Sequence, residues 1–108
     1  MIAYLILEIR IEGARSLKDK RQVVRSVKDG LRRHFNVAVA ELDASNAWQS
    51  ATLGVVSISD SRDYLAGLMQ NVERHAMLLA NNGGGEITDS FLDFLPEAEF
   101  GAHLTGES

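Results

Sequence analysis

Residues 16–35, SLKDKRQVVRSVKDGLRRHF, decide the fold because they carry the pattern of a two-sided helix. Ser16 is typical of an N-cap, with Asp19 three residues on, and Asn36 is suited to a left-handed C-cap. At about 100° per residue the apolar side chains share one broad face. They are Leu17, Val23, Val24, Val27, Leu31 and Phe35. A row of cations, here called the cation row, follows a narrow face beside them: Lys18, Arg21, Arg25, Lys28 and Arg32.

The composition is that of one soluble domain. The chain has 108 residues, of which 45% are hydrophobic and 24% charged, enough for one core and too few for two. It has no cysteine, which excludes disulfides, thiolate metal sites and thiol nucleophiles and fits a reducing cytoplasm. The apolar start, MIAYLILEIRIE, has no basic flank, so we expect a strand rather than a signal peptide or membrane span.

The charges are divided unequally between the two ends of the chain. Residues 1–36 hold nine Lys and Arg against four acids, a charge of +5, and residues 37–108 hold two against eleven, a charge of −9. A concentrated cationic surface on an acidic chain suits local docking on phosphate rather than indiscriminate nucleic-acid binding. The alternative is that the cation row is simply a solvated helix surface.

The periodicity predicts six elements in the order β-α-β-β-α-β. Strands are expected at 3–12, 37–43, 48–59 and 86–95, and helices at 16–35 and from Asp60 or Ser61 to about 81. Both helices are apolar on one face only. This order predicts an α+β, ferredoxin-like sandwich with a four-stranded antiparallel sheet and two helices on one face. Residues 1–95 form this single domain, and 96–108 are expected to be an acidic, flexible tail.

The strand alternation predicts that one sheet face stays uncovered and apolar. We place Tyr4, Val37 and Val39 on that open face, with Trp48 at the start of the third strand. An exposed apolar patch of this kind marks a partner surface. The sequence therefore also predicts a homo-oligomer whose interface contains Tyr4, Val37, Val39 and Trp48.

Several short segments resemble one family of small bacterial proteins. They are SLKDKR at 16–21, RHFNV at 33–37, AELD at 40–43 and WQSATLG at 48–54, and together they resemble the YlxP-like family, a domain of unknown function. The resemblance spans about residues 2–95 and implies a ferredoxin-like fold. The family's genes often lie beside genes for transcription elongation, translation initiation and ribosome-binding factor A, which implies an RNA or ribosome setting. The resemblance brings no active site with it.

Two features have more than one interpretation. Lys20 falls within the apolar helix face: its stem can lie on the core while the ammonium reaches solvent, or the ammonium can be placed to meet a carboxylate or a phosphate. Glu41 and Asp43 share one face of a strand and suit acid–base work or a hard metal ion. With no third ligand apparent, a solvated or salt-bridged pair is the simpler interpretation.

Neither a catalytic constellation nor a cofactor motif is recognisable. His34, His75 and His103 lack ligand spacing and are interpreted as surface or helix-terminal residues. We therefore predict a non-enzymatic, RNA- or ribosome-associated protein of the cytoplasm, with no cofactor, metal or membrane contact. Its predicted nucleic-acid contacts are Arg15, Lys18, Lys20, Arg21, Arg25, Lys28 and Arg32. The alternative is a homo-oligomeric protein-interaction module that uses the open sheet face and has no nucleic-acid role.

Overall fold

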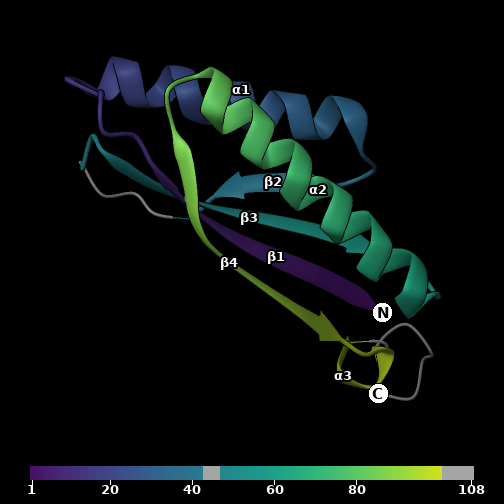
Figure 1. The fold of residues 1–108 in the computed structure, drawn as a ribbon. Helices are drawn as coiled ribbons and strands as arrows, with labels where there is room; N and C mark the ends of the chain where they lie inside the picture. Colours follow the sequence, from purple (N-terminus) through teal and green to yellow (C-terminus); the bar gives the residue numbers. More distant parts are fainter. Residues whose placement is uncertain (43–46, 101–108) are drawn as a thin grey trace.

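A four-stranded antiparallel sheet carries two long helices on one of its faces (Figure 1). The computed structural model describes residues 1–42 and 47–100. The strand order is β2-β3-β1-β4, so the first and third strands are central. The elements are β1 Ile2–Arg10, α1 Leu17–His34, β2 Ala38–Glu41, β3 Ser50–Ile58, α2 Arg62–Asn82, β4 Glu86–Leu95 and α3 Glu97–Phe100. The predicted ferredoxin-like α+β fold is confirmed.

The first helix begins as predicted and ends differently. The Ser16 hydroxyl accepts from the backbone N–H of Asp19 at 3.2 Å, and the Asp19 carboxylate accepts from that of Arg15 at 2.9 Å. The helix ends at His34, and Phe35 is extended, with φ of −134°. The prediction of a left-handed Asn36 cap is wrong, because no described residue other than glycine has positive φ. The Phe35 N–H instead donates to Leu31 O, which completes the last turn.

The core lies between the sheet and the two helices, and Gly30 lets the helices approach closely. Leu5, Leu7 and Leu53 from the sheet are fully buried beneath the helices. A Cβ at Gly30 would lie 2.6 Å from Leu79 Cδ1 of α2. The glycine costs α1 about 1 kcal/mol of helix propensity and provides the space that the Leu79 side chain occupies.

The predicted facing of β2 is wrong. Val39 is only 6% exposed and lies opposite buried Val55, whereas Ala38 and Ala40 are exposed on the other side. Val37 also packs against the core. Every residue of the segment VAVA is apolar, so alternation offers no polar marker, and a one-residue change of facing moves each side chain to the opposite face. The larger side chain takes the core side, so Val37 and Val39 do not belong to the open face.

The chain around the second and third strands also departs from the prediction. Trp48 lies in a turn before β3, which begins at Ser50, so Trp48 is exposed but is not on the sheet. Asp43 and the predicted turn at 44–46 lie outside the described residues. The predicted N-cap of the second helix is confirmed, since the Ser61 hydroxyl accepts from the Tyr64 N–H at 3.1 Å.

The first residues of the predicted tail form the short helix α3. Glu97 of this helix pairs with the N-terminal ammonium of Met1 at 3.6 Å, and residues 101–108 lie outside the described part of the chain. Across residues 1–42 and 47–100, no helix has the length and apolar character needed to cross a membrane.

Candidate nucleic-acid interface

Four members of the cation row line a shallow groove between α1 and the edge of the sheet. The α1–β2 groove has a volume of about 320 Å³, and Arg21, Arg25, Lys28 and Arg32 line it together with Asp29 and Glu41. The helical rise spreads these four cations over about 16 Å along α1. The structure thus places four of the seven predicted nucleic-acid contacts on one concave surface.

Arg32 is held by the edge strand. Its Nη2 donates to the backbone carbonyl of Val39 at 3.1 Å, and its Nη1 lies 4.0 Å from the Asp29 carboxylate. Arg21 and Arg25 are exposed, and neither forms an ion pair with another described residue. Arg32 therefore shapes the groove, while Arg21 and Arg25 present their guanidinium groups to solvent.

Arg15 and Lys18 lie outside the α1–β2 groove. Arg15 belongs to the connection before α1, Lys18 is the second residue of the helix, and both side chains are exposed. They continue the positive surface toward the N-terminal end of α1, where the helix dipole adds to their attraction for anions.

Lys20 does not belong to the cationic surface, contrary to the prediction. The residue is only 4% exposed and lies on the core side of α1. The ammonium donates to the backbone carbonyl of Ala47 at 2.9 Å and lies 4.0 Å from the Glu41 carboxylate. Of the two interpretations of Lys20, pairing with a carboxylate is the one that the structure supports. Lys20 ties α1 to β2 and to the chain that leads into β3.

We expect Lys20→Ala to destabilise the fold by about 2–3 kcal/mol, because it removes a buried stem and a charged hydrogen bond to the backbone. Lys20→Met keeps the volume of the stem and should cost about half as much. Urea unfolding followed by circular dichroism measures both. A Lys20→Ala protein as stable as the wild type would contradict the structural role.

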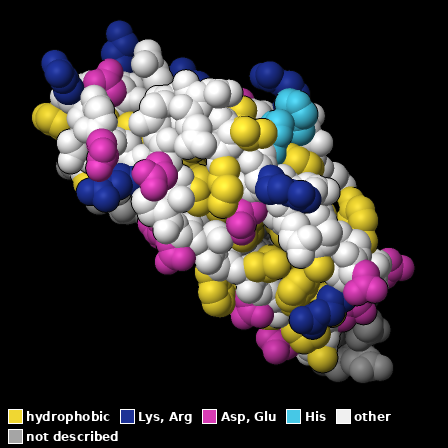
Figure 2. All heavy atoms as spheres, viewed as in Figure 1, with side chains coloured by type: hydrophobic (Ala, Val, Ile, Leu, Met, Phe, Trp, Pro, Cys, Tyr) yellow, Lys and Arg dark blue, Asp and Glu magenta, His cyan; other side chains and the backbone are white. Residues whose placement is uncertain are grey.

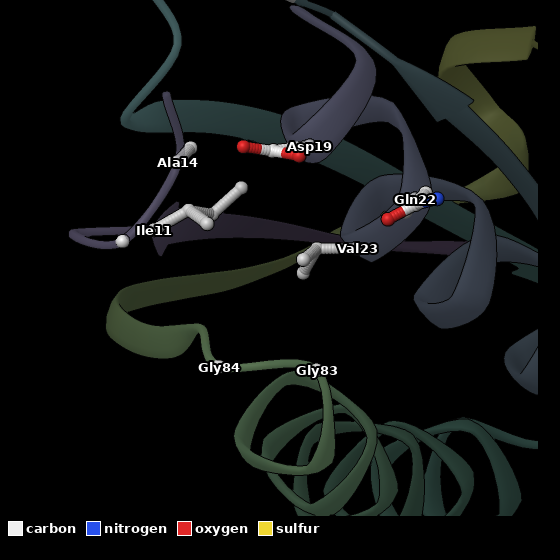
Figure 3. Close-up of a pocket in the computed structure, with 8 residues that line it drawn as sticks. Ile11, Ala14, Asp19, Gln22, Val23, Gly83 and Gly84 are labelled. Carbon is white, nitrogen blue, oxygen red and sulfur yellow. The ribbon is translucent and has the colours of Figure 1, made fainter. Parts of the chain in front are cut away.

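A second hollow, of about 430 Å³, lies at the N-terminal end of α1. Figure 3 shows Asp19 and Gln22 of α1 on one side of it and the Gly83–Gly84 turn on the other. The N–H groups of Gly83, Gly84 and Gly85 all donate to backbone carbonyls of α2. With these donors occupied and a carboxylate on the opposite wall, the hollow is poorly suited to phosphate.

Helix packing brings two histidines together, which the sequence reasoning missed. The rings of His34 and His75 lie 4.3 Å apart between centroids, and Phe35 meets His75 edge-on at 5.6 Å. His34 is the last residue of α1, as predicted, with Nδ1 3.0 Å from Gly30 O. His75 is half-buried rather than a surface residue, and its buried Nε2 has no hydrogen-bond partner within the described chain. His103 lies outside the described residues.

The described residues contain no metal centre of the usual kind. Within residues 1–42 and 47–100, no group of three His, Cys, Asp or Glu side chains is placed to hold a metal ion. Asp43, the proposed partner of Glu41, is not among them. Glu41 itself faces Lys20, which favours the salt-bridged interpretation of this carboxylate.

Comparison with known proteins assigns the chain to a family. Residues 2–91 match the model of the family described as "Protein of unknown function (DUF503)". The chain belongs to this family. It is also 34% identical, over 62 residues, to the uncharacterized protein YlxP of Bacillus subtilis (strain 168). The matched stretch covers 57% of this chain and 67% of YlxP. The resemblance to the YlxP-like family is thereby confirmed.

Solved structures of other proteins share the architecture of this chain. A putative chlorite dismutase, TA0507, superposes with a TM-score of 0.62 at 13% identity, over 94% of this chain and 47% of that protein. The de novo designed protein Foldit4 gives 0.56 at 13% identity, over 89% of this chain and all of that one. A C-terminal segment of the alpha subunit of aIF2 from Pyrococcus abyssi gives 0.52 at 9% identity, over 90% of this chain and 51% of that one. These likenesses concern the fold.

Proposed function

We propose that this DUF503 protein is a non-enzymatic, cytoplasmic accessory protein that docks on RNA or on the ribosome through the α1–β2 groove. The observation that carries the proposal is the exposure of Arg21 and Arg25 along a concave surface, without carboxylate partners among the described residues. Exposed guanidinium groups in a row are the side chains best suited to phosphate oxygens.

The segregation of charge supports binding in a single orientation. In Figure 2 the Lys and Arg side chains along the upper margin follow α1, and Asp and Glu side chains accompany β4. A polyanion is repelled by most of a molecule whose net charge is −4 and attracted by the side that carries the cation row. Such a protein approaches RNA with α1 first.

The geometry of the groove favours contact with the phosphate backbone over reading of bases. Side chains one helical turn apart lie about 5–6 Å from each other, so the row can follow successive phosphates of one strand. Asp29 and Glu41 line the same groove and oppose deep entry of a polyanion. Phosphate contacts fix position without selecting sequence, so we propose recognition of RNA shape or of a ribosomal surface.

Co-sedimentation with bacterial ribosomes at low ionic strength tests this proposal. We expect the protein to pellet with ribosomes, to be released as the salt concentration rises, and to remain in the supernatant after RNase treatment. A protein that stays in the supernatant with intact ribosomes at low ionic strength would overturn the proposal.

A further inference from the structure

The face of the sheet that α1 and α2 leave uncovered is apolar and large. Side chains from all four strands reach this open face, and several are highly exposed: Ile58 is 63% exposed, Phe91 55% and Val56 42%. Leu42, just past β2, is 56% exposed and lies across Gly54, where its Cδ1 would be 2.9 Å from a Cβ. A hollow of about 330 Å³ runs between Leu42, Tyr4 and Ile6. We infer that a second copy of this chain covers the open face in a face-to-face dimer.

Side chains cap part of each edge of the sheet, which disfavours growth of the sheet by strand addition. The N–H of Leu42, just past β2, donates inward to the carbonyl of Thr52 on β3 at 2.8 Å. Because the backbone groups of successive residues alternate in direction along a strand, the carbonyl of Val39 points outward, where Arg32 binds it. On β4 the outward N–H groups of Ser90 and Phe94 donate to the preceding carboxylates, Asp89 and Asp93, at 2.9 and 2.8 Å. Some of the backbone groups that a neighbouring strand would need are thus occupied, which favours the face over the edges as the surface for association.

The charges on the open face identify the kind of partner. Asp89 and Asp93 border the apolar patch on β4, and the Tyr4 hydroxyl donates to Asp93 at 3.4 Å. Glu8 of the central strand β1 lies past Ile6, where its carboxylate accepts from the Thr52 hydroxyl of β3 at 2.8 Å. Burial and the Asp93 carboxylate together raise the pKa of Tyr4 above its ordinary value. These carboxylates repel RNA and anionic membranes, so the open face needs a protein partner that is apolar at its centre.

A second copy meets that requirement by symmetry. With a twofold axis parallel to the strands, β4 of one protomer packs over β2 of its partner, and the open side of β2 carries Ala38, Ala40 and Leu42. Asp89 and Asp93 of each copy then lie at the rim of the interface, open to water and beside the uncharged strip of β2, instead of against the same carboxylates of the partner. Two sheets packed in this way form an aligned sandwich.

The area of the face suits a dimer of moderate affinity. The spacing of the strands and the rise per residue give the sheet a projected area of about 500 Å². The accessible surface of the protruding side chains is larger than this projection, so the face approaches the roughly 800 Å² per partner of standard interfaces. The chain's own residues 101–108 are a weaker candidate for the occupant, because their aliphatic side chains are only Ala102 and Leu104.

Sedimentation equilibrium across a dilution series tests the inference, with Ile58→Asp as the probe and Leu78→Asp as its control. Leu78 on α2 is 62% exposed, so the two substitutions alter exposed aliphatic residues to the same extent. We expect a wild-type dimer that dissociates on dilution, a dimer about a hundredfold weaker in Ile58→Asp, and no change in Leu78→Asp. Thermal melting confirms that each variant is folded, and Leu42→Asp replaces Ile58→Asp should the latter fail to fold.

Three results would overturn the inference. The first is a wild-type monomer at all concentrations. The second is a dimer that survives both open-face substitutions, since its interface then lies elsewhere. The third is a monomer that dimerises only after residues 101–108 are removed, since the tail is then the occupant. Because the chain has no cysteine, a single Val56→Cys variant can also be cross-linked by a short bis-maleimide, whereas Leu78→Cys should stay uncoupled.

Discussion

Replacing Val39 with Asp is expected to abolish cooperative folding, whereas the same replacement at Ala40 should leave the protein folded. Val39 is buried against Val55, and a carboxylate there would lose its hydration in an apolar environment and displace the packing of the valine side chain. The cost is about 4 kcal/mol or more, comparable to the total stability of many small domains. Ala40 faces the open side of the same strand, where Asp should cost about 1 kcal/mol or less.

The pair of variants tests the facing of β2 directly. Urea unfolding monitored by far-ultraviolet circular dichroism gives both stabilities. If Ala40→Asp unfolded the protein and Val39→Asp melted like the wild type, β2 would face the other way, and the open face described above would be wrong.

Replacing both Arg21 and Arg25 with Glu should weaken RNA binding by about a hundredfold near 0.1 M salt. Two lost phosphate contacts remove about 1.4–1.8 units from the slope of log K against log salt, or roughly thirtyfold in affinity near 0.1 M salt. Repulsion of phosphate by the new carboxylates adds the remainder. Fluorescence anisotropy with a labelled ribosomal RNA fragment measures this change.

The matched control reverses two arginines outside the groove. Arg33 on α1 and Arg74 on α2 are exposed, and the Arg33→Glu, Arg74→Glu variant has the same net charge as the groove variant. We expect the control to lose severalfold in affinity through the change in net charge. Equal losses in both variants would show that the α1–β2 groove has no special role.

Much of the fold could be predicted because its signals are local. The helical spacing of Val23, Val27 and Leu31 and the Ser16 cap are properties of the sequence itself, and they placed α1 correctly. The orientation of β2 is not encoded locally. It depends on which side chains of the segment VAVA pack against the helices, and that is decided by the tertiary structure. The Asn36 cap failed for a related reason, because the exit from α1 is set by where β2 joins the sheet.

The candidate site was predictable to the same extent. The cation row was visible as a spacing, and the structure adds that β2 converts it into a groove with Glu41 on the opposite wall. Lys20 stood out by position, but its role required knowing that Ala47 and Glu41 lie beside it. The pairing of His34 with His75 depends on how α1 crosses α2, and no spacing within either helix encodes that.

The salt dependence of RNA binding is the most direct test of the proposed function. With three to five engaged cations, log K of the wild type should fall against log salt with a slope of about −2 to −4. Arg21→Ala with Arg25→Ala should flatten the slope by nearly two units, while Arg33→Ala with Arg74→Ala leaves it almost unchanged. A wild-type protein with no salt-dependent affinity for ribosomal RNA at low ionic strength, or a slope that the Arg21 and Arg25 substitutions do not alter, would contradict docking through the α1–β2 groove.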